Sequence, residues 1–448
     1  MTSYRLQILS FFWAVAIIFS ANSGYGWVID LSHQWSVLLA SVCAIALLSR
    51  PHSPLLLSLS IGAFLLVIAS ISPEIQNHRM VLFFGGVAIL WGIIRTGKES
   101  RIVPDLRWIT IVVYFFAALA KFNTDYLNDE VSCATIFLKG SLQLNGLGGI
   151  ALPSLPGLSS LSGYWSLLVE VLLLVLLIPR RTRGWGILLG VGFHICLATN
   201  YIKYFTNFSG VMILMLSSWL TDDQCHRLWE RYISPNLREF LVGSVVLFSG
   251  LVIKAFGGFD NLLWLIFRYL IWLAYAVYIA VAFVRVVLCE SPRADEKSIG
   301  TPHYALILLA FLNGLSPYLG TKTLSSFSMY SNLRVEPTYT NHLFMPNSLD
   351  LFGYLSDTIR VSSSTDPTHA QLVASPTERL PYLELCAYLD REQEKPPATR
   401  TTITYERNGL TRTTSQGDPI PTDCPRWLPR KLLRFQPVGD GAEKHCVW

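Results

Sequence analysis

The sequence predicts an all-α polytopic membrane helix bundle with nine to eleven spans, followed by a small C-terminal extramembrane domain that is α+β or rich in β-strands. Two features of the composition support this fold class. Of the 448 residues, 52% are hydrophobic and only 15% are charged, whereas an average soluble domain contains about 25% charged residues. The apolar residues are concentrated in runs separated by short polar loops, which is typical of membrane-spanning helices. These features exclude a cytosolic enzyme, a nucleic-acid-binding protein and a secreted module built on disulfides.

A change in composition divides the chain into a bundle of residues 1–320 and a C-terminal domain of residues 321–448. The last 128 residues contain 14 Lys or Arg and 14 Asp or Glu, so their net charge is zero. The first 320 residues contain the other 21 basic and 16 acidic residues and carry the whole net charge of +5. The C-terminal segment has too many β-branched and aromatic residues for a disordered tail, and it is long enough for one small domain.

Eleven apolar segments approach the length of a membrane span, which is about 20 residues and in favourable cases roughly 17. They are residues 6–22, 35–49, 54–72, 80–96, 106–121, 163–179, 184–201, 205–220, 239–257, 261–288 and 303–319. The second segment is short and the last contains Gly314 and Pro317, so nine or ten spans also fit the sequence. The first segment lacks a clean cleavage site for a signal peptidase, so we expect it to remain as a helix.

The basic residues in the loops predict that the N-terminus is cytoplasmic, because cytoplasmic loops are enriched in Lys and Arg. In this orientation fifteen basic residues lie inside and four lie outside. The inside residues are Arg5, Arg50, Arg95, Lys98, Arg101, Arg107, Arg180, Arg181, Arg183, Arg227, Arg231, Arg238, Arg285, Arg293 and Lys297. The outside residues are Arg79, Lys139, Lys203 and Lys254. With eleven spans, the C-terminal domain is then extracytoplasmic.

The eight cysteines show no paired spacing of the kind that binds metals, so no metal site is expected. Three of them, Cys386, Cys424 and Cys446, lie in the C-terminal domain. They could form one disulfide if that side of the membrane is oxidising.

Four ionisable residues lie within the apolar segments and are candidate functional residues, because charge inside a membrane is costly. Lys121 ends the fifth span, Glu170 lies about two turns into the sixth, His194 lies in the seventh and Arg268 interrupts the tenth. From a helix rise of about 1.5 Å per residue and the predicted helix directions, all four lie in the outer half of the membrane. We therefore expect them to share one cavity.

Each of these residues also has a purely structural interpretation. A lysine at the end of a span usually extends toward the lipid headgroups. Glu170 and Arg268 can pair with each other inside the bundle, and an intramembrane histidine such as His194 is often a hydrogen-bonded packing residue.

The segment Ala120-Lys121-Phe122-Asn123-Thr124-Asp125-Tyr126-Leu127 resembles a motif of the vitamin K-dependent gamma-carboxylases and their bacterial relatives, the horizontally transferred transmembrane (HTTM) domain proteins. In that family, a segment of the type Lys-Leu-Asn/Asp-x-Asp-Trp-x-x-Gly ends a span on the lumenal or periplasmic side. A second block is similar in its acidic residue, basic turn and Phe-His pair. Its residues here are Glu170, residues 179–183, Phe193, His194, Asn200 and Phe205. Residues 316–334 and 341–343 resemble the region after the bundle, so the resemblance covers roughly residues 1–390.

The resemblance implies a quinone-dependent membrane enzyme. In the carboxylases a lysine of the motif deprotonates vitamin K hydroquinone, and reaction with oxygen and epoxidation then generate the strong base that removes a γ-proton from a substrate glutamate, to which carbon dioxide adds. Lys121 is the matching residue, and an apolar cavity favours the neutral amine that a general base must be. His194 is then a second catalytic residue and, with Arg268, a candidate to stabilise an oxyanion on the quinone. The expected substrate- or quinone-binding residues are Asn123, Asp125, Glu170 and Arg268.

The implied cofactor is a reduced vitamin K-type quinone. The expected partners are the lipid bilayer, a lipid quinone that enters laterally and a peptide or small substrate, with no nucleic acid.

The chain also departs from the family pattern. Ala120-Lys121 stands where the carboxylases have two lysines, Tyr126 replaces Trp, and Asn128-Asp129 stands where Gly follows. The C-terminal domain leaves less room for propeptide recognition than the large lumenal domain of the animal carboxylases. Because a scaffold can be retained without its reaction, the competing interpretation is non-enzymatic: a membrane maturation, export or immunity factor, or a lipid or quinone carrier.

Overall fold

The computed structural model divides into two compact units, which are described separately. Unit 1 consists of residues 1–70, 78–115 and 137–310, and unit 2 of residues 71–77, 116–136 and 311–448. The described residues are 4–21, 31–96, 102–144, 161–199, 205–255, 261–288, 301–366, 369–375, 377–393, 401–415, 417–439 and 446. Asn200, which the resemblance singled out, lies outside them.

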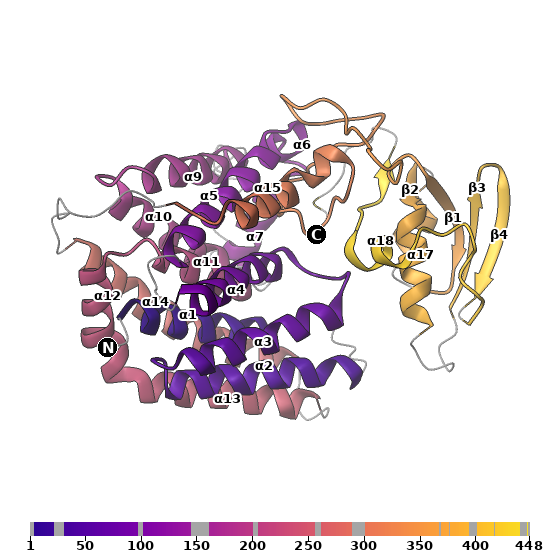
Figure 1. Cartoon of the computed structure of the whole chain (residues 1–448). Helices are drawn as coiled ribbons and strands as arrows, with labels where there is room; N and C mark the ends of the chain where they lie inside the picture. Colours follow the sequence, from indigo (N-terminus) through magenta and orange to yellow (C-terminus); the bar gives the residue numbers. More distant parts are fainter. Residues whose placement is uncertain are drawn as a thin grey trace. The chain divides into compact units, whose positions relative to one another are not determined.

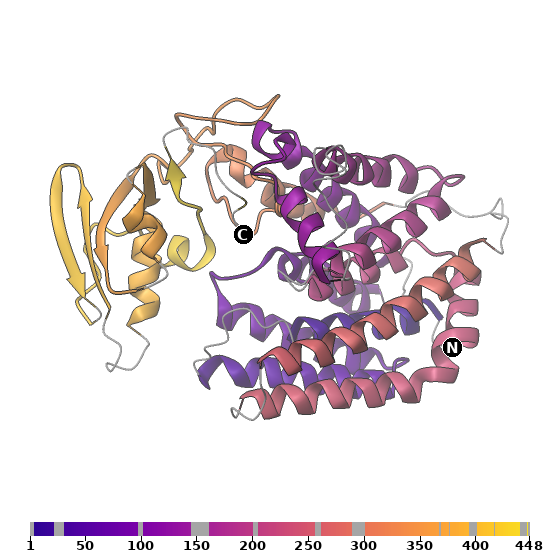
Figure 2. The same cartoon turned by 180° about the vertical axis from the view of Figure 1, so that it is seen from behind.

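All eleven segments predicted as spans form helices (Figure 1). These are α1 (Tyr4–Ala21), α2 (Leu31–Ser49), α3 (Pro54–Ile71), α4 (Asn77–Thr96), α5 (Ile102–Lys121), α9 (Ser162–Leu177), α10 (Arg183–Ala198), α11 (Thr206–Ser217), α13 (Leu237–Ala255), α14 (Asn261–Leu288) and α15 (Tyr304–Leu319). Helix α1 is apolar on every side, and it is buried over almost its whole length, as expected of a helix at the centre of a bundle. Helices α13 and α14 pack against each other and are seen side by side in Figure 2.

Six helices among the described residues are long and apolar enough to cross a membrane. They are Tyr4–Ala21, Pro54–Ile71, Asn77–Arg95, Ile102–Lys121, Asp222–Ile253 and Ile266–Leu288. The other predicted spans are shorter apolar helices in the described part of the chain. The helical, membrane-type character of the bundle is thus confirmed, whereas the count of nine to eleven spans and the orientation of the termini stay predictions.

The connection from α11 to α13 is stabilised by a capping box and by a hydrogen bond from Arg107. The short helix α12 (Asp222–Leu228) begins with a capping box, in which Thr221 and Gln224 each bond the backbone N–H of the other. A π-helical turn (Trp229–Ile233) and a 3-10 turn (Ser234–Asn236) then lead into α13. Arg107 donates to the carbonyl of Ser218 at 2.9 Å, so a guanidinium meets the negative end of the α11 dipole.

Unit 2 contains the short helix α6 (Thr124–Leu127), the start of α7 (Cys133–Leu144) and an α+β domain near the C-terminus. The domain has an antiparallel five-stranded sheet of order β4-β3-β1-β2-β5. The elements are β1 (Thr358–Ser364), α16 (Ala370–Ala374), β2 (Glu378–Pro381), α17 (Tyr382–Glu392), β3 (Thr402–Arg407), β4 (Leu410–Ser415), α18 (Trp427–Leu432) and β5 (Val438–Gly439). The prediction of a small domain with β-structure is therefore confirmed.

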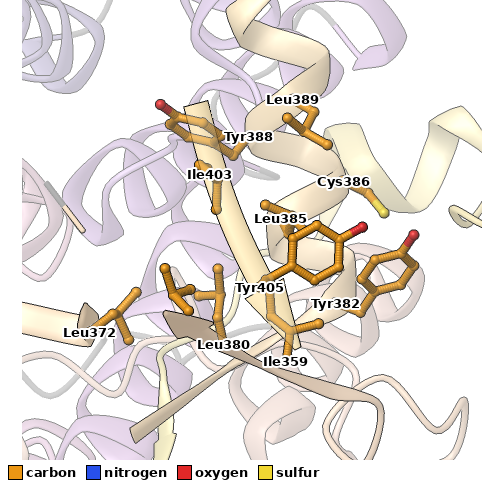
Figure 3. Packing of buried hydrophobic residues seen from close by; sticks show 11 residues of the cluster. Ile359, Leu372, Leu380, Tyr382, Leu385, Cys386, Tyr388, Leu389, Ile403 and Tyr405 are labelled. Atoms are coloured by element: carbon orange, nitrogen blue, oxygen red, sulfur yellow. The ribbon is translucent and has the colours of Figure 1, made fainter. Parts of the chain in front are cut away.

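Helix α17 packs on the sheet through one apolar cluster (Figure 3). Tyr382, Leu385 and Leu389 of the helix meet Ile359 of β1 and Ile403 of β3. Each of these side chains is buried, and the alternation of buried and exposed residues in β1 and β3 is that of strands with one face on a core.

Two disulfides stabilise unit 2. Cys386 of α17 pairs with Cys424, which agrees with the expectation of one bond within the C-terminal domain. Cys446 pairs instead with Cys133, 313 residues earlier in the chain. This second bond was not predicted, because Cys133 lies far outside the C-terminal segment, at the start of α7.

Candidate functional site

The motif at the end of α5 forms a buried polar junction within unit 2. Asn123 is the N-cap of α6, and its side-chain oxygen accepts the backbone N–H of Tyr126 at 2.8 Å. Its amide nitrogen donates to the carbonyls of Ala120 at 2.7 Å and Ser331 at 2.6 Å. The residue is completely buried, so one side chain joins α5, α6 and a segment more than 200 residues away.

Two further asparagines extend this junction. Asn341 donates to the side-chain oxygen of Asn123 at 3.3 Å and to the carbonyl of Asn332 at 2.8 Å. The side-chain oxygen of Asn332 accepts the backbone N–H of Cys133 at 2.9 Å, and its nitrogen donates to the carbonyl of Val131 at 2.9 Å. Since backbone groups buried without partners are costly, these amides fix the path of the chain after α15.

The geometry around His342 defines its tautomer. Its Nε2 lies 2.9 Å from the carbonyl of Leu119, which can only accept, so Nε2 carries the proton. Nδ1 then accepts the backbone N–H groups of Phe344 and Met345, both at 3.0 Å. Burial also lowers the pKa of His342, which favours the neutral imidazole. The side chain therefore connects the end of α5 with residues 344 and 345 through hydrogen bonds.

Lys121 and Asp125 lie on the two sides of Asn123 in the sequence, and both are buried, each 5% exposed. The Lys121 amine donates to the carbonyl of Ala117 at 3.2 Å and lies 5.7 Å from the centre of the Tyr126 ring. One carboxylate oxygen of Asp125 accepts the Thr124 hydroxyl at 3.2 Å. The other has no hydrogen-bond partner among the described residues, and a buried acceptor of this kind is a candidate to receive a hydrogen bond from a ligand.

A second polar cluster lies in unit 1. His194 of α10 is 1% exposed, and its Nε2 is 2.8 Å from the hydroxyl of Tyr114 on α5. Glu170 of α9 is buried and lies close enough to Tyr114 to act on it electrostatically. Ser209 of α11 donates to the His194 carbonyl at 2.6 Å. Four helices therefore contribute to one buried group of polar residues.

Aromatic rings enclose the imidazole of His194. Phe193 and Phe208 pack against it in T-shaped arrangements, with ring centroids 5.3 Å and 5.1 Å away. Charge and proton transfer in such an environment are shielded from bulk water, so the electrostatic effect of each neighbour is stronger than at a surface.

Arg268 is also deeply buried, at 3% exposed, in the first turns of α14.

On α4, His78 lies 3.3 Å from the Asn207 amide of α11. Neither His78 nor Asn207 was expected from the sequence, and Tyr114 was missed as well. The sequence signal for all three residues is a polar ring or amide within an apolar run, which is less conspicuous there than a lysine, an arginine or a glutamate.

The six predicted residues fall into two groups. Lys121, Asn123 and Asp125 belong to unit 2, and Glu170, His194 and Arg268 belong to unit 1. Within unit 1, Tyr114 connects Glu170 with His194. The single cavity expected for Lys121, Glu170, His194 and Arg268 stays a prediction.

The described residues contain no group of three or more His, Cys, Asp or Glu side chains that could hold a metal ion. The chain matches no family model, no curated protein and no solved structure.

Proposed function

We propose that the protein is an integral membrane enzyme that uses a reduced vitamin K-type quinone at the extracytoplasmic face, with a reaction related to carboxylation and quinone epoxidation by the gamma-carboxylases. The observation that carries this proposal is the buried set of Tyr114, His194 and Glu170 in an apolar bundle. Ionisable residues at such positions are expensive and usually serve binding or proton transfer.

The available groups fit a hydroquinone, which has hydroxyl groups on an apolar ring. Its site requires apolar walls together with acceptors and donors for those hydroxyls. Phe193 and Phe208 supply aromatic rings beside His194. In unit 2, the carboxylate oxygen of Asp125 that has no hydrogen-bond partner among the described residues is a separate buried acceptor.

Lys121 is the proposed general base, and His194 the second catalytic residue. The Lys121 amine would accept a proton from a hydroxyl, and Asp125 would orient that hydroxyl. His194 would donate to an oxygen that becomes negative, while Tyr114 holds its ring and Glu170 polarises the tyrosine. The reduced quinone, when bound, supplies the reducing equivalents that convert oxygen into a strong base.

Asn123 receives a different role in this proposal from the one the resemblance implies. Both atoms of its amide already bond to Ala120, Ser331 and Tyr126. We therefore assign Asn123 to positioning Lys121 and Asp125. Arg268 remains the candidate for holding a quinone oxygen.

Two independent features support an extracytoplasmic location for unit 2. The excess of basic loop residues on the other side agrees with the positive-inside rule. Both disulfides belong to unit 2, and disulfides persist mainly in oxidising compartments.

The direct test uses the full-length protein in lipid nanodiscs with reduced vitamin K, a glutamate-containing peptide and labelled bicarbonate. Epoxide formation and incorporation of label are measured separately. We expect Lys121→Met to lower both rates by about 100-fold or more, as for loss of a general base. The control is Lys139→Met, which removes an exposed lysine of α7. Normal turnover by a folded Lys121→Met protein, or no turnover and no quinone binding by the parent protein, would exclude the proposal.

The competing proposal is a non-enzymatic maturation, export or immunity factor, or a lipid or quinone carrier. The observation that favours it is that the motif at the end of α5 makes structural contacts. Asn123 donates a hydrogen bond to the carbonyl of Ser331, and His342 donates one to the carbonyl of Leu119 in α5. A cellular phenotype that survives Lys121→Met but is lost in Asn123→Ala would favour this reading.

A further inference from the structure

Unit 2 exposes a group of large apolar side chains on two short segments, residues 343–352 and residues 427–432. Phe344 is 68% exposed, Phe352 64% and Trp427 64%. The others are Leu343, Leu349, Leu351, Leu428 and Leu432. Side chains of this kind are normally scattered singly over a water-facing surface, whereas a dense group of them marks a binding surface.

The first segment is fastened to the ends of two apolar helices. The backbone N–H of Leu343 donates to the carbonyl of Phe122, directly after the last residue of α5, at 2.9 Å. Further along, Leu349 and Leu351 donate to the carbonyls of Tyr318 and Leu319, at the end of α15, at 3.0 Å and 3.1 Å. The chain therefore passes from the end of one apolar helix to the end of another.

The close approach at α15 depends on a glycine. Gly320 has a φ of +67°, and a Cβ at this position would lie 2.5 Å from the Cα of Asp350. Glycine is the residue that adopts this conformation without strain, and it brings residues 349–352 directly against the helix end.

The second segment is held at the turn between α3 and α4. The hydroxyl of Ser72, one residue beyond α3, donates to the carbonyl of Lys431 in α18. In the same turn, Glu74 forms an ion pair with Arg434 at 3.3 Å. Both segments thus attach at the ends of apolar helices: α3 and α5 are long enough to cross a membrane, and α15 is a shorter apolar helix.

We propose that residues 343–352 and 427–432 form an interfacial collar that inserts its Leu, Phe and Trp side chains into the lipid leaflet on the side of unit 2. An apolar helix that crosses a membrane ends at the boundary between the acyl chains and the headgroups. Side chains fastened at those ends lie at this boundary, where Trp and other aromatic residues are enriched. The exposed Arg426 beside Trp427 is placed to meet anionic headgroups. The occupant of this surface is therefore lipid.

The test is photolabelling of the full-length protein in vesicles of phosphatidylcholine and phosphatidylglycerol that carry a diazirine on the acyl chain. Labelled peptides are then quantified by mass spectrometry. The internal control is Leu410, which is 60% exposed but lies at the turn between β3 and β4. We expect the peptides with Phe344 and Trp427 to carry at least ten-fold more label than the peptide with Leu410.

Variants separate insertion from a general effect on folding. Replacing Phe344 and Phe352 by Ser should remove label from residues 343–352 and leave the label on Trp427 unchanged, whereas Leu410→Ser should change neither. Equal labelling of Leu410 and the collar would overturn the proposal. So would the absence of label from the collar, including a case in which protein crosslinks there reveal a second copy or another protein. Because no quinone or turnover is involved, this result is independent of the enzymatic proposal.

Discussion

Replacing Asn123 by Ala should destabilise unit 2 more than any ordinary surface change. The substitution removes four hydrogen bonds: two donated to the carbonyls of Ala120 and Ser331, one accepted from the N–H of Tyr126 and one accepted from the side-chain amide of Asn341. A net hydrogen bond contributes about 1 kcal/mol, and a buried group left without a partner adds to the loss. The expected loss in the free energy of unfolding is therefore about 3–4 kcal/mol.

For a unit of 150–250 residues, 1 kcal/mol corresponds to about 2–4 °C in Tm. Asn123→Ala should thus lower the Tm of the purified protein in detergent by about 6–16 °C, measured by intrinsic fluorescence. The matched control is Asn347→Ala, whose exposed amide makes one bond to the carbonyl of Pro337 at 3.0 Å and should shift the Tm by no more than about 2 °C. Equal Tm shifts in the two variants would refute the structural role of Asn123. An unchanged Tm together with a loss of quinone binding would show that Asn123 binds the ligand instead.

Three further predictions concern unit 2. Replacing Cys386 and Cys424 by Ser opens a disulfide whose cysteines are 38 residues apart; we expect a loss of about 4 kcal/mol, seen as faster proteolysis of the C-terminal domain, and unchanged protease resistance would contradict this. Burial lowers the pKa of Lys322 to about 8. Between pH 8 and 10.5 the unfolded chain therefore binds more protons than the folded one. The free energy of unfolding should rise with pH across that window, by on the order of 3 kcal/mol. Lys322→Met should abolish this rise, measured as denaturant midpoints at several pH values. Gly314→Val should destabilise by about 1–3 kcal/mol, because a Cβ at this position would overlap the ring of Phe116.

Controls for these predictions follow from the same contacts. Lys431→Met removes a partly exposed lysine that lies 3.7 Å from Asp390 and should leave the rise in stability above pH 8 in place. A smaller residue at position 116 should restore part of the stability of Gly314→Val. If the double variant is no more stable than Gly314→Val, overlap with the ring is not the cause.

The sequence predicted the local structure well where one physical requirement dominates. A span needs a run of about 20 apolar residues, and such runs placed eleven helices within a few residues of their observed ends. The excess of polar residues after position 320 also predicted a small C-terminal domain, and the antiparallel sheet lies in that segment. The observed unit 2 nevertheless includes residues 71–77 and 116–136, because hydrogen bonds and a disulfide connect these turns to the domain.

Lys121, Glu170, His194 and Arg268 were identified from the sequence because an ionisable residue is conspicuous in an apolar run, and each of them is buried. Their partners could not be identified in this way. The hydrogen bond between Tyr114 and His194 joins residues 80 positions apart, and that between Asn123 and Ser331 joins residues 208 positions apart. The disulfide between Cys133 and Cys446 spans 313 positions. Hydrogen bonds and disulfides between distant segments leave no periodic pattern in the chain, since they form only after the helices have brought those segments together. The sequence by itself therefore determined which apolar segments are helices and pointed to Lys121, Glu170, His194 and Arg268 as polar residues within them, and only the tertiary structure decided which other polar residues are buried and which of them act together.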